Sequence, residues 1–406
     1  MLIEKQFQHT WKSFLASGIA AGAVCLCLAA CGSPNNPDGQ ASSGAESAPA
    51  QELSHGDFSG KKVAVSLPDS SGRWETEGAL LEQLLKAEGC VVELAFAEEV
   101  PPKEDAPEGA EPVSSQAEDA ARLIRDGCDV LIVAPEGENA DLSLSVQAAR
   151  EKGIPVISYD ELLMDTDAVS YYVAYDSYKE GQLQGSFVAA ALGLSAEDHS
   201  KEHHVEFSGG NPEDYRSAYL FNGAYDTLKP FLDSGALSVP SGQVTFFQVA
   251  TSDGDAKNAS ARLEEILQTN YGGDLQLDAV LCSTDAEAAG AVEVLSPGKD
   301  KKKQVIITGL GAGEEALANV ADGKQSMTLY EDREREALVA AALACSLLTG
   351  DAADANLIKD SGWGFACSYD TASYDNGKGI VPSYLLEPDI VTQNTINAAA
   401  QKSSEE

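Results

Sequence analysis

The chain has 406 residues, 43% of them hydrophobic, which is long enough for two domains with cores of their own and argues against disorder as its main state. Its formal net charge at pH 7 is -38. A field of that sign repels phosphate backbones and anionic lipid surfaces, so nucleic-acid binding is disfavoured. The charge says little about a small uncharged ligand.

The amino terminus has the pattern of a targeting segment. Two lysines precede an apolar run, residues 14–30, that is too short for a confident membrane span. The run ends in small residues directly before Cys31, which resembles a bacterial lipoprotein signal. Residues 33–54 are rich in Pro, Gly, Ser and Asn, as in a flexible tether. We expect a signal peptide over 1–30 and lipidation of Cys31 at the head of a tether, 31–56; an ordinary secretory signal or a short anchor is the alternative.

Strands and helices alternate regularly from Lys61 onward. The apolar periods predict strands at 63–67, 91–96, 130–133 and 156–159, separated by helices at 75–88, 117–125 and 142–152. Gly89, Gly127 and Gly153 each follow a helix directly, where a left-handed residue ends it at little cost. This alternation predicts a parallel sheet with helices on both faces.

The same alternation resumes after Asp176. It predicts strands at 205–208, 244–249, 279–282, 305–310 and 327–330, with helices at 179–192, 218–232, 255–269, 286–295, 314–322 and 334–348. The stretch 156–176 separates the two halves and places Asp160 and Glu161 at the carboxyl end of a strand, where a ligand crevice is expected. The fold class is therefore α/β, with two doubly wound parallel-sheet lobes joined by a multi-strand hinge that suits closure on a ligand.

Later segments are expected to complete each lobe. We assign residues 57–175 and 312–380 to the N-terminal lobe, 176–311 and 381–392 to the C-terminal lobe, and 393–406 to a polar tail.

Five cysteines follow Cys31, so at least one thiol is free or paired between molecules. Cys90 and Cys128 precede strands that flank the first strand of the sheet, two spacings of about 4.8 Å apart, which exceeds the reach of a disulfide, about 7 Å. Cys345 with Cys367 is the candidate disulfide in an extracytoplasmic compartment.

A series of motifs carries a family resemblance that extends from Lys61 to about Asn394. In chain order they are Ser71-Gly-Arg-Trp74, Ser158-Tyr-Asp160, the segment 171–176, Ser208-Gly-Gly-Asn-Pro-Glu-Asp214, the segment 228–235 and Val381-Pro-Ser-Tyr-Leu-Leu386. As an ordered ensemble they resemble the monosaccharide-binding lipoproteins of ABC transporters, in the xylose-binding and multiple-sugar-binding branch of the type I periplasmic-binding-protein family.

The resemblance implies a receptor that is not an enzyme and needs no cofactor. Such a protein captures a monosaccharide between its lobes and delivers it to an ABC-transporter permease. It would be a monomer outside the cytoplasm, held by its lipid anchor at the outer face of the bacterial cytoplasmic membrane.

The same resemblance suggests ligand-binding residues. Arg73 matches an arginine that clamps sugar hydroxyls, although it could instead pair with a surface acid. Asp160 matches an aspartate of the ligand crevice, with helix capping as the alternative. Asp285 matches a further such position, and could equally be an N-cap. Trp74 either packs at the rim or stacks on a sugar face.

The chain also departs from the family's pattern. Glu161 stands where an arginine is usual, and Tyr215-Arg216 replace paired asparagines after the turn that ends at Asp214. Gly309-Leu-Gly311 replaces Gly-Gln-Asp, and Glu331 replaces a lysine. We include Glu161, Asp214, Tyr215 and Arg216 among the ligand-binding candidates, with the hypothesis that the arginine gained at Arg216 compensates for the one lost at Glu161.

Other motifs are weaker. His199, His203 and His204 lie in a charged connector and we predict no metal site there. The glycines of the segment 309–313 lack the spacing of a dinucleotide-binding loop. Two other functions stay open: a receptor of the same fold for a nucleoside or a signal molecule that serves a sensor or a transporter, and a hydrolase that acts on a sugar conjugate.

Overall fold

The computed structural model describes residues 58–100, 113–135, 140–195, 197, 201–273, 275–295, 304–350 and 352–402. The expected signal peptide, Cys31 and the tether lie outside these residues. Within the described ranges, no helix is both long and apolar enough to cross a membrane.

The N-terminal lobe is built on a seven-stranded sheet with the strand order β13-β14-β7-β6-β5-β1-β2. These strands are β1 (Lys62–Leu67), β2 (Val91–Phe96), β5 (Val130–Val133), β6 (Val156–Tyr159), β7 (Val169–Tyr175), β13 (Cys367–Asp370) and β14 (Ser383–Leu386). All neighbours are parallel except β13, which pairs antiparallel with β14 at one edge. The residues of β5 and β6 are buried throughout, as expected for central strands covered on both faces.

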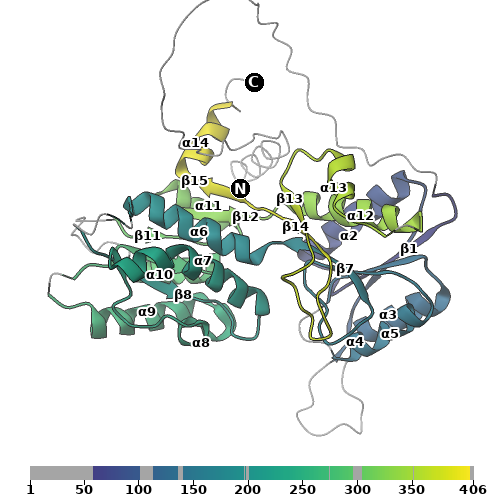
Figure 1. The fold of residues 1–406 in the computed structure, drawn as a ribbon, viewed down its shortest axis with the longest axis horizontal. Coiled ribbons are helices and arrows are strands. Elements are labelled where there is room, and N and C mark those ends of the chain that lie inside the picture. The colour runs from purple at the N-terminus through teal and green to yellow at the C-terminus, as the bar shows by residue number, and fades with distance from the viewer. Residues whose placement is uncertain are drawn as a thin grey trace, which may run out of the picture.

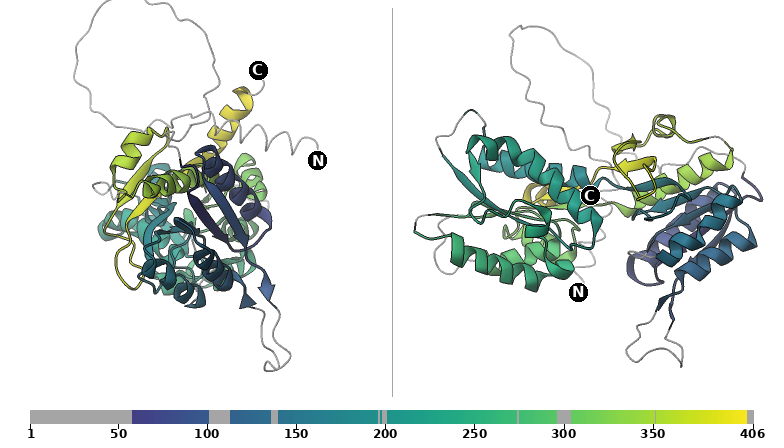
Figure 2. Two further views of the ribbon diagram at one scale, coloured as in Figure 1. Left: turned by 90° about the vertical axis from the view of Figure 1, so that its right-hand side faces the viewer. Right: turned by 60° about the horizontal axis from the view of Figure 1, so that its bottom comes forward.

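Helices cover both faces of this sheet (Figures 1 and 2). They are α2 (Gly72–Ala87), α12 (Arg333–Leu348) and α13 (Asn356–Ser361) with one core, and α3 (Gln116–Asp126), α4 (Ala140–Ser145) and α5 (Gln147–Glu151) with the other. Because side chains alternate along a strand, Val63 and Val65 join the core that contains α2 and α12, and Ala64 joins the core that contains α3. A short hairpin, β3 (Glu99–Val100) and β4 (Val113–Ser114), stands beside the sheet.

The C-terminal lobe has a parallel four-stranded sheet with the order β11-β10-β8-β9. Its strands are β8 (His203–Ser208), β9 (Leu237–Ser238), β10 (Ala279–Cys282) and β11 (Ile306–Ile307). Its helices are α6 (Ser177–Leu192), α7 (Tyr215–Ser234), α8 (Phe246–Val249), η1 (Ser252–Gly254), α9 (Ala256–Asn270), α10 (Asp285–Leu295), α11 (Glu314–Ala321) and α14 (Gln393–Lys402). One core lies between the sheet and α6 and α7, and a second lies on the side of α9 and α10.

The late segments do not fall in the lobes that we predicted. β12 (Met327–Tyr330) pairs with β15 (Asp389–Thr392), and its Leu329 bridges Leu310 next to β11, so this pair extends the sheet of the C-terminal lobe. β14 instead lies beside β7 in the N-terminal sheet. The assignment of 312–330 to the N-terminal lobe and of the β14 residues to the C-terminal lobe was therefore wrong. A strand belongs to the lobe of the strands with which it pairs. The apolar pattern of its sequence does not identify those partners.

The chain consequently crosses between the lobes three times, after β7, after β12 and between β14 and β15 (Figure 1). Two of these crossings run straight into a helix that an aspartate caps. Asp176 accepts a hydrogen bond from the backbone N–H of Lys179 at the start of α6, and Asp332 accepts one from Glu334 at the start of α12. The caps fix where each helix leaves the hinge.

The structure also differs from two local predictions. The apolar run 244–249 forms the helix α8 where we predicted a strand, because Thr245 and Gln248 make a capping box that starts a helical turn. The expected polar tail begins with α14, which packs Ile396 against Val320 and Val391.

The predicted disulfide is absent from this structure. All five cysteines of the described ranges are free thiols, and Cys345 lies in α12 where that helix packs on α2. Among the described cysteines, Cys90 is the one that interacts with Cys345, and its presence adds to burial in raising the pKa of the Cys345 thiol. Cys367 lies on the edge strand β13 and is not bonded to Cys345 in this structure, so the candidate pair Cys345 and Cys367 stays a prediction.

Glycines allow α6 and α7 to pack with their backbones in contact. A Cβ atom at Gly223 would lie 2.0 Å from the carbonyl oxygen of Tyr178, and one at Gly181 would lie 1.9 Å from that of Leu220. Neither glycine can carry a side chain unless the helices separate.

We therefore expect Gly223→Ala to destabilise the protein by at least about 2 kcal/mol, because the added methyl group meets backbone atoms that cannot move alone. Urea or thermal unfolding measures the loss. The control is Gly364→Ala, where a Cβ would have no heavy atom within 4 Å. Equal stability of the two variants would contradict the close helix contact.

Candidate functional site

A buried charge cluster joins the two lobes. We use the name arginine cluster for Arg73, Asp160, Arg216, Glu331, Arg333 and Glu336. Arg73 comes from α2, Arg333 and Glu336 from α12, Arg216 from the first turn of α7, and Asp160 follows β6. Glu331 directly follows β12, at a crossing between the lobes. The cluster thus gathers side chains from both lobes and from the hinge.

Asp160 is the centre of the arginine cluster. Its side chain accepts hydrogen bonds from Arg73, from Nη1 of Arg333 at 2.8 Å and from Nη1 of Arg216 at 3.4 Å. Burial alone would raise its pKa, but the three guanidinium groups hold the pKa of this carboxyl well below its usual range. Its backbone has φ 65°, a left-handed conformation that few non-glycine residues adopt. Asp160 is therefore a fixed anion in a strained turn.

Arg73 is the most exposed arginine of the cluster, with 37% of its side chain accessible. Its guanidinium carbon lies 4.0 Å from the ring centroid of Trp74, in cation–π contact, and its Nε lies 3.6 Å from a carboxylate oxygen of Glu77. Trp74 packs partly buried against the core of the N-terminal lobe. The Trp74 ring therefore packs against the Arg73 guanidinium, and the accessible part of the arginine keeps polar atoms available to a ligand.

Glu331 bridges two arginines from different lobes. Its Oε1 accepts from Nη2 of Arg216 at 2.7 Å, and its Oε2 accepts from Nη2 of Arg333. Burial would raise its pKa, but Arg333 and Arg216 outweigh that effect and lower it. Nε of Arg216 also donates to Ser177, so each of the three nitrogens of this guanidinium donates a hydrogen bond.

The carboxyl groups around the cluster stay protonated more readily than exposed acids. Burial, followed by the charge of Asp160, raises the pKa of Glu336 to about 8 and that of Glu161 to about 7. Burial and the charge of Glu331 raise the pKa of Glu180 well above its usual value. Asp160 and Glu331 are therefore the acids of the cluster that stay ionised near neutral pH, whereas Glu336 is mostly protonated there and Glu161 about half protonated.

An aromatic contact ties α7 to the N-terminal lobe. The Tyr215 hydroxyl accepts a hydrogen bond from the backbone N–H of Leu162 at 2.7 Å and lies 3.0 Å from the hydroxyl of Tyr172. Tyr219, one turn later, stacks on Tyr374 with ring centroids 5.2 Å apart and planes within 8°. Tyr215 thus acts as a contact between the lobes in this structure.

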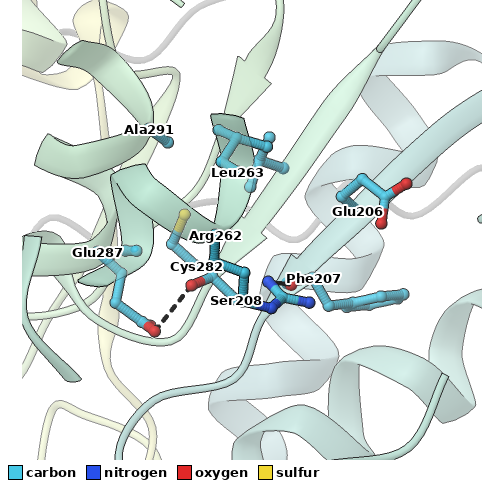
Figure 3. A pocket seen from close by; sticks show the side chains of 10 residues that line it. Glu206, Phe207, Ser208, Arg262, Leu263, Cys282, Glu287 and Ala291 are labelled. Atoms are coloured by element: carbon cyan, nitrogen blue, oxygen red, sulfur yellow. Dashed lines mark hydrogen bonds between the residues drawn. The ribbon is translucent and has the colours of Figure 1, made fainter. Parts of the chain in front are cut away.

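The start of α7 depends on Asp214 and on a carboxylate below it. Asp214 caps the helix by accepting from the backbone N–H of Arg216 at 2.8 Å, which is the role of an N-cap. In the pocket of Figure 3, Glu287 accepts hydrogen bonds from Ser208 at 2.8 Å and from the backbone of Gly210 at 3.0 Å. These bonds hold the turn that carries Arg216 into the cluster.

Asp285 is engaged elsewhere. Its carboxylate accepts hydrogen bonds from Gln325 at 2.8 Å, Thr328 at 2.9 Å and the backbone N–H of Ala312 at 2.6 Å. A Cβ at Gly309 would lie 2.2 Å from its Oδ1. Gly309 therefore makes room for this carboxylate, which fastens the turn between β11 and α11.

The histidines show no shared ligand geometry. His203 pairs with Asp278, with 3.3 Å between Nδ1 and Oδ2, and Nδ1 of His204 lies 3.0 Å from the carbonyl oxygen of Gln276. His199 is outside the described residues. In the ranges that the structure covers, no group of three or more His, Cys, Asp or Glu side chains is arranged to hold a metal ion.

The chain matches the family described as "Periplasmic binding protein domain" over residues 63–352. It is 31% identical over 330 residues to the multiple sugar-binding periplasmic protein SbpA of Azospirillum brasilense, covering 80% of this chain and 84% of the relative. It is 30% identical over 330 residues to the multiple sugar-binding periplasmic receptor ChvE of Rhizobium radiobacter, covering 80% and 85%.

Solved structures agree with this likeness. An ABC-transporter solute-binding protein of Clostridium phytofermentans with bound β-D-glucose is 33% identical, with a TM-score of 0.65 and coverage of 84% of this chain and 97% of that one. The α/β architecture with two lobes is the type I periplasmic-binding fold, and the predicted fold class is confirmed. The chain belongs to the periplasmic binding protein family, whose members are extracytoplasmic, non-enzymatic substrate-binding proteins of transport systems.

The structure brings together most of the predicted site residues. Arg73, Asp160 and Arg216 are in the arginine cluster, and Trp74 lies under Arg73, whereas Asp214 and Tyr215 shape the start of α7. Glu161 directly follows Asp160, whose negative charge adds to the effect of burial in raising the pKa of Glu161. No described contact joins Asp285 to the cluster.

Sequence reasoning missed Arg333 and Glu336 and gave Glu331 no partner. A signal was present, because residues 332–336 alternate acid and base shortly after a predicted strand. Such a run is commonly an exposed helix start, and only the crossing after β12 turns it toward the cluster.

The raised pKa of Glu161 predicts a pH-dependent stability. An acid whose folded pKa is about 7, against 4.5 when exposed, holds its proton more tightly in the folded chain, so its contribution to stability is lost as pH rises from about 4.5 to about 7. We expect Glu161→Gln to be more stable than wild type at pH 8 by about 1–3 kcal/mol and nearly equal at pH 4. Urea unfolding at both pH values measures this difference.

Glu118→Gln, at an exposed glutamate of α3, is the control for that comparison. If Glu161→Gln exceeded wild type in stability no more at pH 8 than at pH 4, burial of an ionised Glu161 would carry no cost. The raised pKa that we assign to Glu161 would then be wrong.

The pair Arg216 and Glu331 should act as a unit. Removal of one partner takes one of two charged partners from the other buried group, since Glu331 keeps Arg333 and Arg216 keeps Asp160, so we expect Arg216→Gln and Glu331→Gln each to destabilise the protein by about 2 kcal/mol. The double variant should lose less than the sum of the two, by at least about 1 kcal/mol. A double-mutant cycle in urea unfolding gives this coupling.

The exposed pair Glu82 and Lys86 of α2, at 2.6 Å, is the control with near-zero coupling. Additive losses at Arg216 and Glu331 would refute their pairing.

Proposed function

We propose that this protein is a lipid-anchored receptor that captures a monosaccharide between its lobes and delivers it to an ABC-transporter permease. The observation that carries the proposal is the arginine cluster at the junction of the lobes, in a chain whose relatives include named sugar-binding receptors and a glucose-bound structure. Lipid attachment at Cys31, a monomeric state and the permease partner belong to the same proposal.

The chemistry of the cluster suits sugar hydroxyls. A hydroxyl can donate to a carboxylate and accept from a guanidinium at the same time, and bonds to charged groups are stronger than neutral ones. Asp160 offers the anion and Arg73 the accessible donor, since the other two arginines are more deeply buried. Trp74 and Tyr215 supply aromatic surface next to these groups, as an apolar sugar face requires.

The departures from the family bear on which ligand fits. We hypothesised that Arg216 compensates for the arginine lost at Glu161. The hydrogen bonds of Arg216 go to Glu331, Asp160 and Ser177, so we propose that Arg216 and Glu331 replaced their family counterparts as a mutually neutralising pair. Compensation for Glu161 stays a prediction.

We expect Arg73→Ala to weaken binding of the preferred sugar by roughly 10- to 100-fold, because one charged hydrogen-bonding group is lost. Xylose, glucose, galactose, arabinose, fucose and ribose are first screened by thermal shift, since a ligand of the folded state raises its stability. Calorimetry then compares wild type with Arg73→Ala. Arg125→Ala, at an exposed arginine of α3 that pairs only with Asp126 among the described ion pairs, is the control.

Unchanged affinity in Arg73→Ala would remove Arg73 from the site. A shift with nucleosides and none with sugars would favour the second candidate, a receptor of the same fold for a non-sugar molecule. The specific observation behind that candidate is the altered set of Glu161, Arg216 and Glu331.

A further inference from the structure

Two cysteines far apart in sequence meet in the N-terminal lobe. Cys90 lies in the turn between α2 and β2, and Cys345 lies in α12. Each is 6% exposed, and both belong to the core that includes Leu81 and Leu85 of α2. Cys90 follows the end of α2 and Cys345 lies near the end of α12, which packs along α2, and beside the larger effect of burial each thiol shifts the pKa of the other, lowering that of Cys90 and raising that of Cys345.

The other cysteines of the described ranges are placed differently. Cys128 packs against the core on the opposite face of the sheet, and Cys282 is buried in the C-terminal lobe. Cys367 is partly buried on the edge strand β13. Cys367 also packs against the core that holds Cys90 and Cys345, but among the described cysteines the thiols of Cys90 and Cys345 are the two that affect each other.

We propose that Cys90 and Cys345 form a disulfide when the protein folds outside the cytoplasm. The family places the chain in an extracytoplasmic compartment, where disulfides form and persist. The proposal rests on that location and on the packing of α12 against α2, and does not depend on which ligand the protein binds.

The oxidation needs a disulfide of the thiol oxidoreductase class or a small-molecule disulfide as oxidant. The thiolate of one cysteine attacks the oxidant's disulfide and displaces one of its sulfurs as a thiol. The second cysteine then attacks this mixed disulfide, which forms the Cys90–Cys345 bond and releases the oxidant's other sulfur. The two cysteines lose two protons and two electrons, and the oxidant's disulfide becomes two thiols.

Burial dictates when this reaction takes place. Desolvation raises the pKa of both thiols in the folded lobe, and the thiolate is the attacking form, so the folded protein should react slowly. The bond therefore forms before α12 closes over α2. Once formed, it is shielded from reductants by the same core.

The bond would hold together the two helices that build one side of the arginine cluster. α2 carries Arg73 near its start, and α12 carries Arg333 and Glu336 in its first turns. A covalent link at the other end of this helix pair would restrict how far the helices separate, and so would fix the spacing of the three side chains.

The test is to denature and reduce the full-length protein, to refold it in a mixture of reduced and oxidised glutathione, and to alkylate the remaining thiols. Lysines and arginines separate Cys90, Cys128, Cys282, Cys345 and Cys367 into different tryptic peptides. We expect a non-reducing digest to show the Cys90 peptide joined to the Cys345 peptide, and the other three of these cysteines alkylated.

Two single variants sharpen the result. Cys90→Ser should leave Cys345 alkylated, and Cys367→Ser, the control, should leave the joined peptides unchanged. Wild type and Cys367→Ser refolded under reducing conditions should each have a lower thermal midpoint than when refolded in the glutathione mixture, and the midpoint of Cys90→Ser should be the same in both. If Cys90 and Cys345 are both fully alkylated after refolding in the glutathione mixture, or if either is joined to a different cysteine, the proposal is wrong.

Discussion

The structure depends on one buried carboxylate that three guanidinium groups keep ionised. Asp160 would be costly to bury alone, because desolvation disfavours the charged form. Its partners Arg73, Arg216 and Arg333 come from α2, α7 and α12, so neutralisation of this one charge requires elements of both lobes to converge. Glu331 balances the surplus positive charge on the hinge side, and the remaining acids nearby are kept largely protonated by burial. The cluster is thus a structural junction, and we propose that a hydroxylated ligand meets it through Arg73, its most accessible arginine.

The topology explains why the cluster lies where the lobes meet. Three crossings join the sheets, and two of them end in capped helices, α6 and α12, whose first turns carry Glu180 and Arg333. The turn that leads into α7 is held from below by Glu287, and Tyr215 fastens that helix to Leu162 of the other lobe. Relative motion of the lobes would therefore change the contacts of Tyr215 and Arg216 directly. Such coupling is what a receptor that closes on its ligand requires.

The alternation of strands and helices was predictable from sequence because central parallel strands are apolar along their whole length and bounded by glycine-capped helices. The lobe that receives β12 or β14 was not, since a strand's partner is fixed by tertiary packing. Similarly, Arg73 and Asp160 were found through motif position, whereas Arg333 needs the hinge geometry to reach the cluster. Asp285 lies apart from the cluster for a local reason: its carboxylate accepts hydrogen bonds from Gln325, Thr328 and a backbone N–H, which sequence spacing alone does not reveal.

The central claim is that a monosaccharide binds at the arginine cluster between the lobes. The most direct measurement is a crystal structure of the protein grown with the sugar that stabilises it most. We expect the sugar within hydrogen-bond distance of both Arg73 and Asp160, with the lobes closed around it. A sugar bound away from these two side chains, or lobes that stay apart with the sugar in place, would contradict it.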